Sequence, residues 1–403
     1  MLPKGWKTAS VTSVCTQVSV GIVVNPSHYY VAEGEGVRAF RSGNVRENAV
    51  QDEKWVYLSD EGHQKNSKSK LRAGDVLVVR TGFAGTACVV PKEFDGCNCI
   101  DILFARPDLN KVVPEYLAQL TNSEHGRRQV FSGQSGLAQK HLNVSSYSKM
   151  TFALPQVHEQ RRIVEILSTW DQAIVAAERV VANSQRQRLG LTQTLISDRS
   201  RQARGMPTLP REHASAIFLP RSVRRNDDLE LLSVMQDVGV VPRSSLDRKV
   251  VMPEGSTEGY KLVEPGDFVI SLRSFEGGLE YSRFRGLVSP AYTVLQPAKP
   301  IVDDFYRHYF KSREFIGRLA VAVIGIRDGK QISYDDFEFL KLPYPPIAEQ
   351  EAIANTLNAA EQVVKRHETY LQLLRQEKAA LMSQLLTGER RVKLPDAETE
   401  VQA

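Results

Sequence analysis

One motif occurs twice in this chain, 190 residues apart. Residues 154–160 read Leu-Pro-Gln-Val-His-Glu-Gln, and residues 344–350 read Tyr-Pro-Pro-Ile-Ala-Glu-Gln. In both copies a proline stands just ahead of a long helix-forming run, where it can end a preceding strand and lead into a helix. A repeat with so long a period constrains the architecture more than any single motif, because it predicts two structurally equivalent halves.

Both runs that follow the motif carry a heptad seam, with seam positions at alternating steps of four and three. The seams match at the same offset, and Arg188 in the first is matched by Lys378 in the second. We predict helices over about 158–196 and 348–387, and the first would be a rod about 58 Å long at about 1.5 Å per residue. We expect the two helices to pair with each other, and the alternative is a homodimeric coiled coil. The apolar seam positions are Ile163, Leu167, Ile174, Val181, Leu191 and Leu195 in the first run, and Ile353, Leu357, Val364, Leu371, Leu381 and Leu385 in the second.

The segments ahead of the helices also correspond. Residues 71–79 and 263–271 each place a Gly-Asp turn before a β-branched run, and Lys140 matches Lys330 at the offset of 190. Short β-branched runs at 76–79, 87–90, 268–271 and 292–295 mix with apparent helices at 113–122 and 303–312. We therefore predict an α/β chain of mixed α+β type, with two homologous globular domains, two long helices and an internal pseudo-two-fold repeat. The predicted boundaries are 1–153 and 211–343 for the domains, 154–197 and 344–388 for the helical segments, 198–210 for a linker and 389–403 for a polar tail.

Composition narrows the class of protein. With 403 residues and 42% hydrophobic content, the chain is expected to form more than one core. The net charge of +5 permits a polyanionic partner without requiring one. Because the N-terminus has no apolar signal region and no apolar run is long enough to span a membrane, we expect a cytoplasmic protein with no membrane partner. Four cysteines do not suggest a disulfide framework, and Cys97 and Cys99 are not followed by a second ligand pair, so no metal site is expected.

Motifs that carry chemistry are missing or imperfect. Residues 34–39 fit G-x-G-x-x-A, but they neither leave a convincing strand nor open a helix, so we interpret them as a loop. Residues 325–331 fall one residue short of a phosphate-binding loop and end in glutamine. The sequence contains no G-x-S-x-G, no H-E-x-x-H and no Asn or Asp followed by Pro-Pro-aromatic. We therefore expect no catalytic residues in this chain.

The doubled motif, placed ahead of two heptad helices and after two divergent globular segments, resembles the specificity subunits of type I restriction-modification enzymes. The resemblance covers nearly the whole chain, although His158 stands where that family usually has alanine, as at Ala348. It implies two target-recognition domains joined by an antiparallel coiled coil, each reading one half of a split, asymmetric DNA site. It also implies two copies of an adenine-N6 methyltransferase subunit and an ATP-dependent endonuclease and translocase subunit as partners. On this interpretation the chain needs no cofactor, and S-adenosylmethionine, ATP and Mg²⁺ belong to the partner subunits.

DNA contacts are expected from basic and amide side chains in loops, since Arg and Lys suit guanine while Asn and Gln suit adenine. The alternative for any single residue is a solvated charge or a salt bridge. Lys140 and Lys330 are the better candidates for phosphate contacts, because a duplicated residue favours a shared backbone role over base reading. The candidates are Arg41, Asn44, Arg46, Arg80 and Lys140 in the first domain, and Arg243, Arg273, Arg327 and Lys330 in the second.

Two other classes of function remain as alternatives. A scaffold that binds proteins through two homologous domains on helical arms would have no DNA role, and neighbouring genes for a methyltransferase and a helicase-nuclease would argue against it. A complete restriction enzyme is disfavoured by the missing motifs, and methylation or cleavage of DNA by the chain alone would revive it.

Overall fold

The computed structural model describes residues 2–131, 141–224, 229–246, 259–271, 274–322 and 332–393. The chain divides into two compact units, of which unit 1 comprises Met1–Glu178 and Tyr370–Ala403, and unit 2 comprises Arg179–Thr369. Two long helices, α6 (Val157–Ile196) and α13 (Ile347–Thr387), each contribute one half to each unit. Their bounds agree within one residue with the helices predicted from the heptads.

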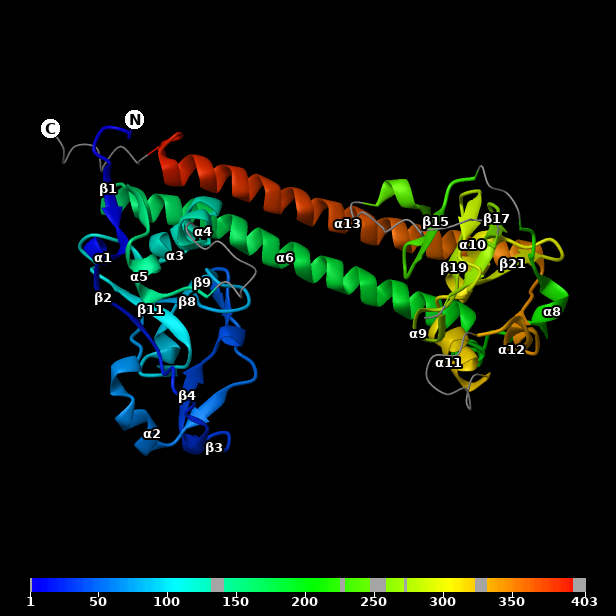
Figure 1. Cartoon of the computed structure of the whole chain (residues 1–403), viewed down its shortest axis with the longest axis horizontal. Helices are drawn as coiled ribbons and strands as arrows, with labels where there is room; N and C mark the ends of the chain where they lie inside the picture. Colours follow the sequence, from blue (N-terminus) through cyan, green and yellow to red (C-terminus); the bar gives the residue numbers. More distant parts are fainter. Residues whose placement is uncertain are drawn as a thin grey trace. The chain divides into compact units, whose positions relative to one another are not determined.

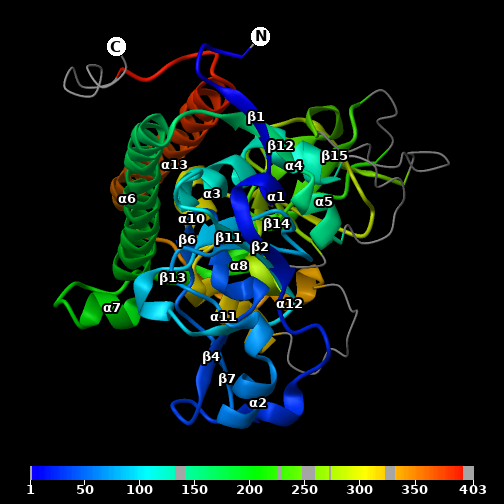
Figure 2. The ribbon, with the colours of Figure 1, turned by 90° about the vertical axis from the view of Figure 1, so that its left-hand side faces the viewer.

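The two long helices lie alongside each other and run in opposite directions (Figures 1 and 2). In unit 1, Arg375 donates a hydrogen bond to Glu178 (2.6 Å) and Lys378 donates one to Asp171 (2.6 Å). In unit 2, the Ser184 hydroxyl lies 2.7 Å from Nδ1 of His367. As the residue numbers increase along α6, the numbers of their partners on α13 decrease. The two helices are therefore antiparallel, which confirms the antiparallel coiled coil within the chain.

Burial follows the predicted seam with one exception. Leu191 is exposed, so its assignment to the seam is wrong; five residues later Ile196 is fully buried in the core of unit 2. The seam at this end of α6 turns from the partner helix toward the globular core, and a heptad count alone cannot detect that change. Eight of the other predicted positions are buried, namely Ile163, Leu167, Val181, Ile353, Leu357, Val364, Leu371 and Leu385, whereas Ile174, Leu195 and Leu381 are partly buried.

The globular part of unit 1 is built on a four-stranded antiparallel sheet in the order β2-β11-β8-β9, beside a second sheet in the order β10-β4-β7-β3. Strands β1 and β12 pair next to the start of α6, and β5 pairs with β6. The elements are β1 (Lys7–Ser10), α1 (Val11–Val14), β2 (Cys15–Val20), β3 (Tyr30–Val31), β4 (Val37–Phe40), β5 (Val45–Arg46), β6 (Ala49–Val50), β7 (Val56–Leu58), α2 (Asp60–Lys65), β8 (Val76–Val79), β9 (Ala87–Val89), β10 (Asn98–Cys99), β11 (Ile102–Pro107), α3 (Pro114–Asn122), α4 (Glu124–Phe131), α5 (Val144–Ser148) and β12 (Thr151–Leu154).

Unit 2 repeats the main sheet and the strand pair beside the long helix, but it has the two-stranded sheets β15-β16 and β17-β20 where unit 1 has its second four-stranded sheet. Its four-stranded antiparallel sheet has the order β14-β21-β18-β19, and β13 pairs with β22 as β1 pairs with β12. The shared strand order confirms that the two globular parts are homologous in layout. The elements are α7 (Asp198–Gln202), β13 (Arg211–His213), α8 (Ala214–Ile217), β14 (Phe218–Pro220), β15 (Leu232–Met235), β16 (Gly239–Pro242), β17 (Lys261–Val263), β18 (Phe268–Ile270), α9 (Ser274–Gly277), β19 (Glu280–Tyr281), β20 (Gly286–Val288), β21 (Thr293–Pro297), α10 (Asp303–Tyr309), α11 (Arg313–Ala322), α12 (Tyr334–Glu338) and β22 (Lys341–Pro343).

Each of the duplicated Gly-Asp turns holds a buried aspartate that pairs with an arginine. Gly74 and Gly266 adopt left-handed φ angles of 88° and 97°, which glycine reaches without the steric cost of a side chain. The aspartate that follows is buried in both cases. Asp75 accepts hydrogen bonds from Arg106, and Asp267 accepts them from Arg221. The repeated turn thus places a buried aspartate at the entry to β8 and β18, but its arginine partner comes from β11 in unit 1 and from the residue after β14 in unit 2.

The glutamine that ends each copy of the doubled motif joins the long helix to its globular part by hydrogen bonds. The buried amide of Gln160 accepts a hydrogen bond from the Val113 backbone N–H (2.8 Å) and donates to the carbonyls of Lys111 (2.9 Å) and Pro155 (2.9 Å). Gln350 repeats this pattern with the Val302 N–H (3.0 Å) and the Pro345 carbonyl (2.9 Å). Val113 and Val302 precede α3 and α10, so each glutamine satisfies a backbone donor that the helix start leaves without an internal partner.

Two segments outside the globular parts are more ordered than the sequence predicts. Within the predicted linker, α7 forms a short helix, and Arg201 is buried because its guanidinium donates to the Pro207 and Leu195 carbonyls and to Glu349. Within the predicted polar tail, Arg391 binds Glu159. Composition suggested solvated chain at both places, but each arginine pairs with a glutamate that is distant in the sequence.

Candidate nucleic-acid interface

A cavity of about 760 Å³ in unit 1 gathers several of the predicted DNA-contacting residues. Arg41, Asn44 and Arg46 line it, together with residues that follow β2 and with Thr81, which follows β8. We refer to it as the Arg41 cavity. Its wall also includes Lys54, which is exposed and adopts a left-handed φ of 54° in the loop before β7. Lys54 was missed by sequence reasoning, and its only signal was a lysine in a short polar loop between two strands.

Charge in the Arg41 cavity is mostly positive. Arg41 and Arg46 are exposed, as Lys54 is, and the acidic lining residues are Glu53 and Asp101. Asp101 is already paired with the guanidinium of Arg80. An open surface with three exposed cations suits a phosphate backbone, which supplies most of the affinity of DNA-binding proteins.

Asn44 has a structural role. It is 2% exposed; its Oδ1 accepts a hydrogen bond from the Arg41 N–H (2.9 Å), while its Nδ2 donates to the carbonyls of Gln51 (3.2 Å) and Glu53 (2.9 Å). The amide is therefore used within the loop, and the prediction that Asn44 reads a base is corrected. Its contribution is to hold the loop that carries Arg41 and Lys54.

Arg80 is likewise engaged within the protein. Besides its pairing with Asp101, it donates from Nε to the Leu142 carbonyl (3.2 Å) and contacts the ring of His141. Its side chain is only 13% exposed. These contacts make Arg80 the anchor of the turn after β8 rather than a free contact for DNA, which is the salt-bridge alternative stated for the candidates.

In unit 2, Arg243 follows β16 and begins a short 3-10 helix at Arg243–Ser245. Two of its guanidinium nitrogens, Nε and Nη1, are buried without a hydrogen-bond acceptor in the part of the chain that the structure describes. The other predicted residues, Lys140, Arg273, Arg327 and Lys330, lie outside the described residues. The structure therefore brings together candidates from unit 1 but leaves those of unit 2 as predictions.

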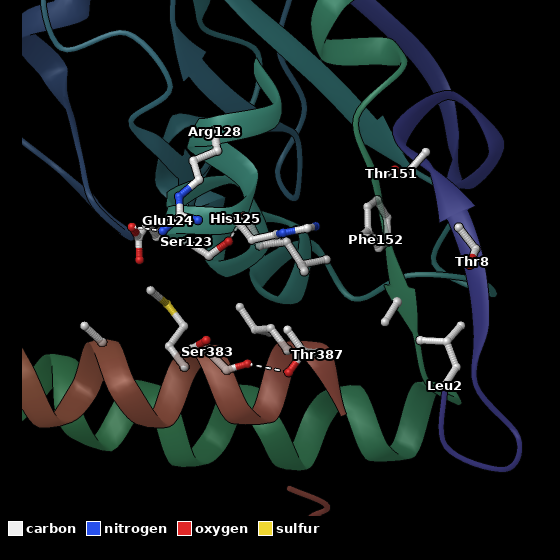
Figure 3. A pocket seen from close by; sticks show the side chains of 15 residues that line it. Leu2, Thr8, Ser123, Glu124, His125, Arg128, Thr151, Phe152, Ser383 and Thr387 are labelled. Carbon is white, nitrogen blue, oxygen red and sulfur yellow. Dashed lines mark hydrogen bonds and ion pairs between the residues drawn. The ribbon is translucent and has the colours of Figure 1, made fainter. Parts of the chain in front are cut away.

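A second cavity in unit 1, of about 430 Å³, lies where α4 and β12 face the last turns of α13 (Figure 3). Its lining includes Phe152, the first turns of α4 and Ser383 of α13. The Ser123 hydroxyl donates to the Leu120 carbonyl (2.6 Å), and the His125 ring lies 2.7 Å from Nε2 of Gln129. These contacts stabilise the helix start and do not form a nucleophile and base pair.

Groups able to perform covalent chemistry are poorly placed. Burial raises the pKa of the Cys15 and Cys88 thiols to about 12 and that of Cys97 to about 11, so these thiols stay protonated near neutral pH. Over the described ranges, no three His, Cys, Asp or Glu side chains gather closely enough to hold a metal ion. None of the described helices is both long and apolar enough to cross a membrane.

Comparison with known proteins finds similarity to type I specificity subunits. No family model matches the chain. A protein of Methanocaldococcus jannaschii described as "Putative type I restriction enzyme MjaX specificity subunit" is 22% identical over 433 residues, which cover 97% of this chain and 95% of that protein. The chain is thus similar in sequence, over nearly its whole length, to a type I specificity subunit, and the resemblance seen in the doubled motif is confirmed.

Solved structures agree on the fold. One solved structure belongs to work on the structural basis underlying complex assembly and conformational transition of the type I R-M system. It matches with a TM-score of 0.62 at 17% identity, covering 97% of this chain and all of that one. The S subunit of a type I system from M. genitalium matches with a TM-score of 0.54 at 12% identity, covering 97% of each chain. The HsdS subunit from Thermoanaerobacter tengcongensis gives a TM-score of 0.50 at 18% identity, covering 96% of this chain and 98% of that one.

Proposed function

We propose that this chain, which is similar over 97% of its length to a type I restriction enzyme specificity subunit, is the non-catalytic subunit that selects the DNA sequence for a type I restriction-modification complex. Each globular part reads one half of a split DNA site, and the two halves differ because the two parts have diverged. The observation that carries this proposal is the end-to-end sequence similarity together with the duplicated fold.

The Arg41 cavity supports contact with DNA in unit 1. Arg41, Arg46 and Lys54 can neutralise phosphates and fix the register of the protein on the duplex, because phosphate contacts position a protein without carrying sequence information. Other groups beside these cations would then contact the bases and read the sequence. In unit 2, Arg243, Arg273, Arg327 and Lys330 remain the proposed contacts.

The helices support assembly with catalytic partners. Several apolar side chains stay exposed along them, and these are the side chains that a partner protein would cover. Because the Gln160 and Gln350 junctions are copies of each other, they offer two equivalent places, which suits two copies of an adenine-N6 methyltransferase. That subunit would carry S-adenosylmethionine, and an endonuclease and translocase subunit would carry ATP and Mg²⁺. The exposed apolar residues are Val175, Tyr370 and Leu373 in unit 1, and Val180, Leu189, Leu191, Ile347 and Val363 in unit 2.

Co-expression with the methyltransferase subunit proposed as its partner tests the proposal. We expect N6-methyladenine in a single split motif with an unread spacer, detected by single-molecule methylation sequencing. The strain without this gene is the control. A continuous motif, or an active methyltransferase whose motif does not depend on this chain, would contradict the proposal.

A length change in the helices tests the proposed role of the coiled coil. Because Ser184 contacts His367, seven residues inserted beside both positions would preserve the heptad pairing and add about 10 Å of helix. At about 3.4 Å per base pair, we expect the unread spacer to lengthen by about three base pairs while both half-sites stay the same. Changed half-site sequences would show that the helices do not set the spacing.

A further inference from the structure

Phe83 is the most exposed large apolar side chain among the described residues. It lies in the turn between β8 and β9, and 85% of its surface is open to solvent. Exposing an aromatic side chain forfeits about 1.5–3 kcal/mol of burial free energy. An aromatic ring held in water at a loop tip therefore suggests a binding partner.

The turn that carries Phe83 has a defined conformation. Gly82 and Gly85 take left-handed φ angles of 77° and 86°. The Gly85 N–H donates to the Val79 carbonyl (2.9 Å), and the Thr86 N–H donates to the carbonyl of Phe83 itself (3.1 Å). These bonds hold the backbone of the turn in place, so the ring projects from an ordered tip.

This tip stands beside the Arg41 cavity. Thr81 and Asp101 both line the cavity, and Asp101 pairs with Arg80 at the base of the turn. Phe83 follows Thr81 by two residues, so their Cα atoms lie within about 7 Å of each other. The ring is therefore an apolar group placed next to a cluster of cations that fits a phosphate backbone.

We propose that Phe83 contacts the apolar surface of a base in the half-site read by unit 1. This inference rests on the proposed function and deepens it by naming a residue that determines sequence preference. Duplex DNA offers a ring two apolar surfaces: the methyl group of thymine in the major groove, and the face of a base at a step that has been opened. The nearby cations hold the strand while the ring meets the base.

The test uses the full chain in complex with its methyltransferase and a duplex that carries the mapped site. Because aromatic contact with a base is worth about 1–3 kcal/mol, we expect Phe83→Ala to weaken specific binding about tenfold. Binding to non-specific duplex and the dependence of affinity on salt should stay unchanged, since no phosphate contact is lost. Phe83→Trp should restore binding to near the wild-type value. Leu109→Ala is the matched control, because Leu109 is another exposed apolar residue of unit 1, at 65%.

Modified duplexes distinguish the two surfaces. Replacement of each thymine by uracil would reproduce the loss in wild-type protein, and abolish the effect of Phe83→Ala, if the ring contacts a methyl group. A rise in 2-aminopurine fluorescence at one step, absent with Phe83→Ala, would instead place the ring at an opened step.

Two results would overturn the inference. One is a Phe83→Ala complex that binds the site as tightly as wild type, and the other is an equal loss of affinity on specific and non-specific DNA. In both cases methylation of a split site by the wild-type complex would leave the proposed function standing. Failure of the proposed function itself would appear as wild-type protein with no preference for any site.

Discussion

Arg391 donates hydrogen bonds to both carboxylate oxygens of Glu159, from Nε at 3.0 Å and from Nη2 at 2.9 Å. Arg391 follows the end of α13, and Glu159 stands in the first turn of α6. In unit 2, Arg201 follows α6 and donates to Glu349 (2.7 Å) in the first turn of α13. Both members of the second pair lie 190 residues from those of the first, so the duplication includes the contact that fastens the end of one long helix to the start of the other.

Loss of this contact should destabilise unit 1. Glu159 is 2% exposed, and in the Arg391→Ala variant its one remaining hydrogen bond within the described ranges would come from Trp6 (3.0 Å). We expect the free energy of unfolding to fall by roughly 1–2 kcal/mol, toward the low end because half of the Arg391 side chain is screened by water. Urea denaturation measures the change. Arg390→Ala is the control, since Arg390 is exposed, and equal midpoints for the two variants would contradict the expectation.

Replacement of Gln160 by leucine removes the hydrogen bonds that join the start of α6 to the globular part of unit 1. The Val113 N–H and the carbonyls of Lys111 and Pro155 would lose their partner at a buried or partly buried place, at a cost of about 3 kcal/mol. Thermal unfolding should show a clear drop in Tm, and Gln350→Leu should give a comparable drop in unit 2. Gln187→Leu lies on an exposed position of the same helix and serves as the control. A Gln160→Leu chain as stable as the control would refute this role.

Lys378 and Asp171 form an ion pair within the seam, and we expect their contributions to the free energy of unfolding to be coupled. The Lys378 side chain is 9% exposed, so Lys378→Met would leave the Asp171 carboxylate without its main counter-charge and cost about 1–3 kcal/mol. Adding Asp171→Asn should recover most of that loss, because an amide carries no charge and can still accept the hydrogen bond from Gln119.

A matched exposed pair provides the control for that cycle. Arg375 and Glu178 are joined across the same two helices at 2.6 Å, but their side chains are 57% and 46% exposed. Arg375→Met should change the free energy of unfolding by less than about 1 kcal/mol. If Arg375→Met and Lys378→Met lower the free energy of unfolding by the same amount, burial of the Lys378–Asp171 pair has no energetic consequence.

Stability should fall in mildly acidic solution through His308. Burial lowers the pKa of His308 below its ordinary value of 6.5, while the ring contacts Asn358 at 2.8 Å. Because the pKa of His308 is lower in the folded state, the unfolded chain binds more protons at pH values between the folded-state and unfolded-state pKa. The contribution of His308 to stability is therefore complete above about pH 6.5, the ordinary pKa, and is lost as the pH falls below that value. His308→Gln should have a flatter profile of unfolding free energy between about pH 5 and 7. Because the pKa of His63 is also lowered by burial, part of the slope should remain in the variant.

The cations of the Arg41 cavity should contribute to affinity through phosphates. Each of Arg41→Ala, Arg46→Ala and Lys54→Ala should weaken binding on every sequence and reduce the slope of log affinity against log salt by about 0.9. Titration of the chain, in the proposed complex with a methyltransferase subunit, with duplex DNA at several salt concentrations measures this slope. Lys149→Ala removes an exposed lysine of unit 1 that does not line the cavity, and an equal change in that variant would argue against a localised contact.

Local patterns allowed the large elements to be predicted. Heptads, prolines and glycines lie within a few residues of the structure that they specify, so the bounds of α6 and α13 followed from the sequence, as did the strands that include Val76 and Phe268. The offset of 190 also indicated the duplication before any contact was known. Strand order was not predicted, because it depends on pairing between segments that are far apart in the chain.

What the sequence by itself determined is therefore the set of elements and their repetition, since these arise from periodicity and turn chemistry along a short stretch of chain. Only the tertiary structure decided which polar groups are free to bind a partner. Arg41 and Asn44 stand three residues apart in one loop, yet Arg41 is exposed while Asn44 is buried and fully hydrogen-bonded. Arg80 is taken by Asp101 and the carbonyl of Leu142, 21 and 62 residues away. A buried polar group must find partners wherever the fold brings them, and residue type alone cannot reveal that choice.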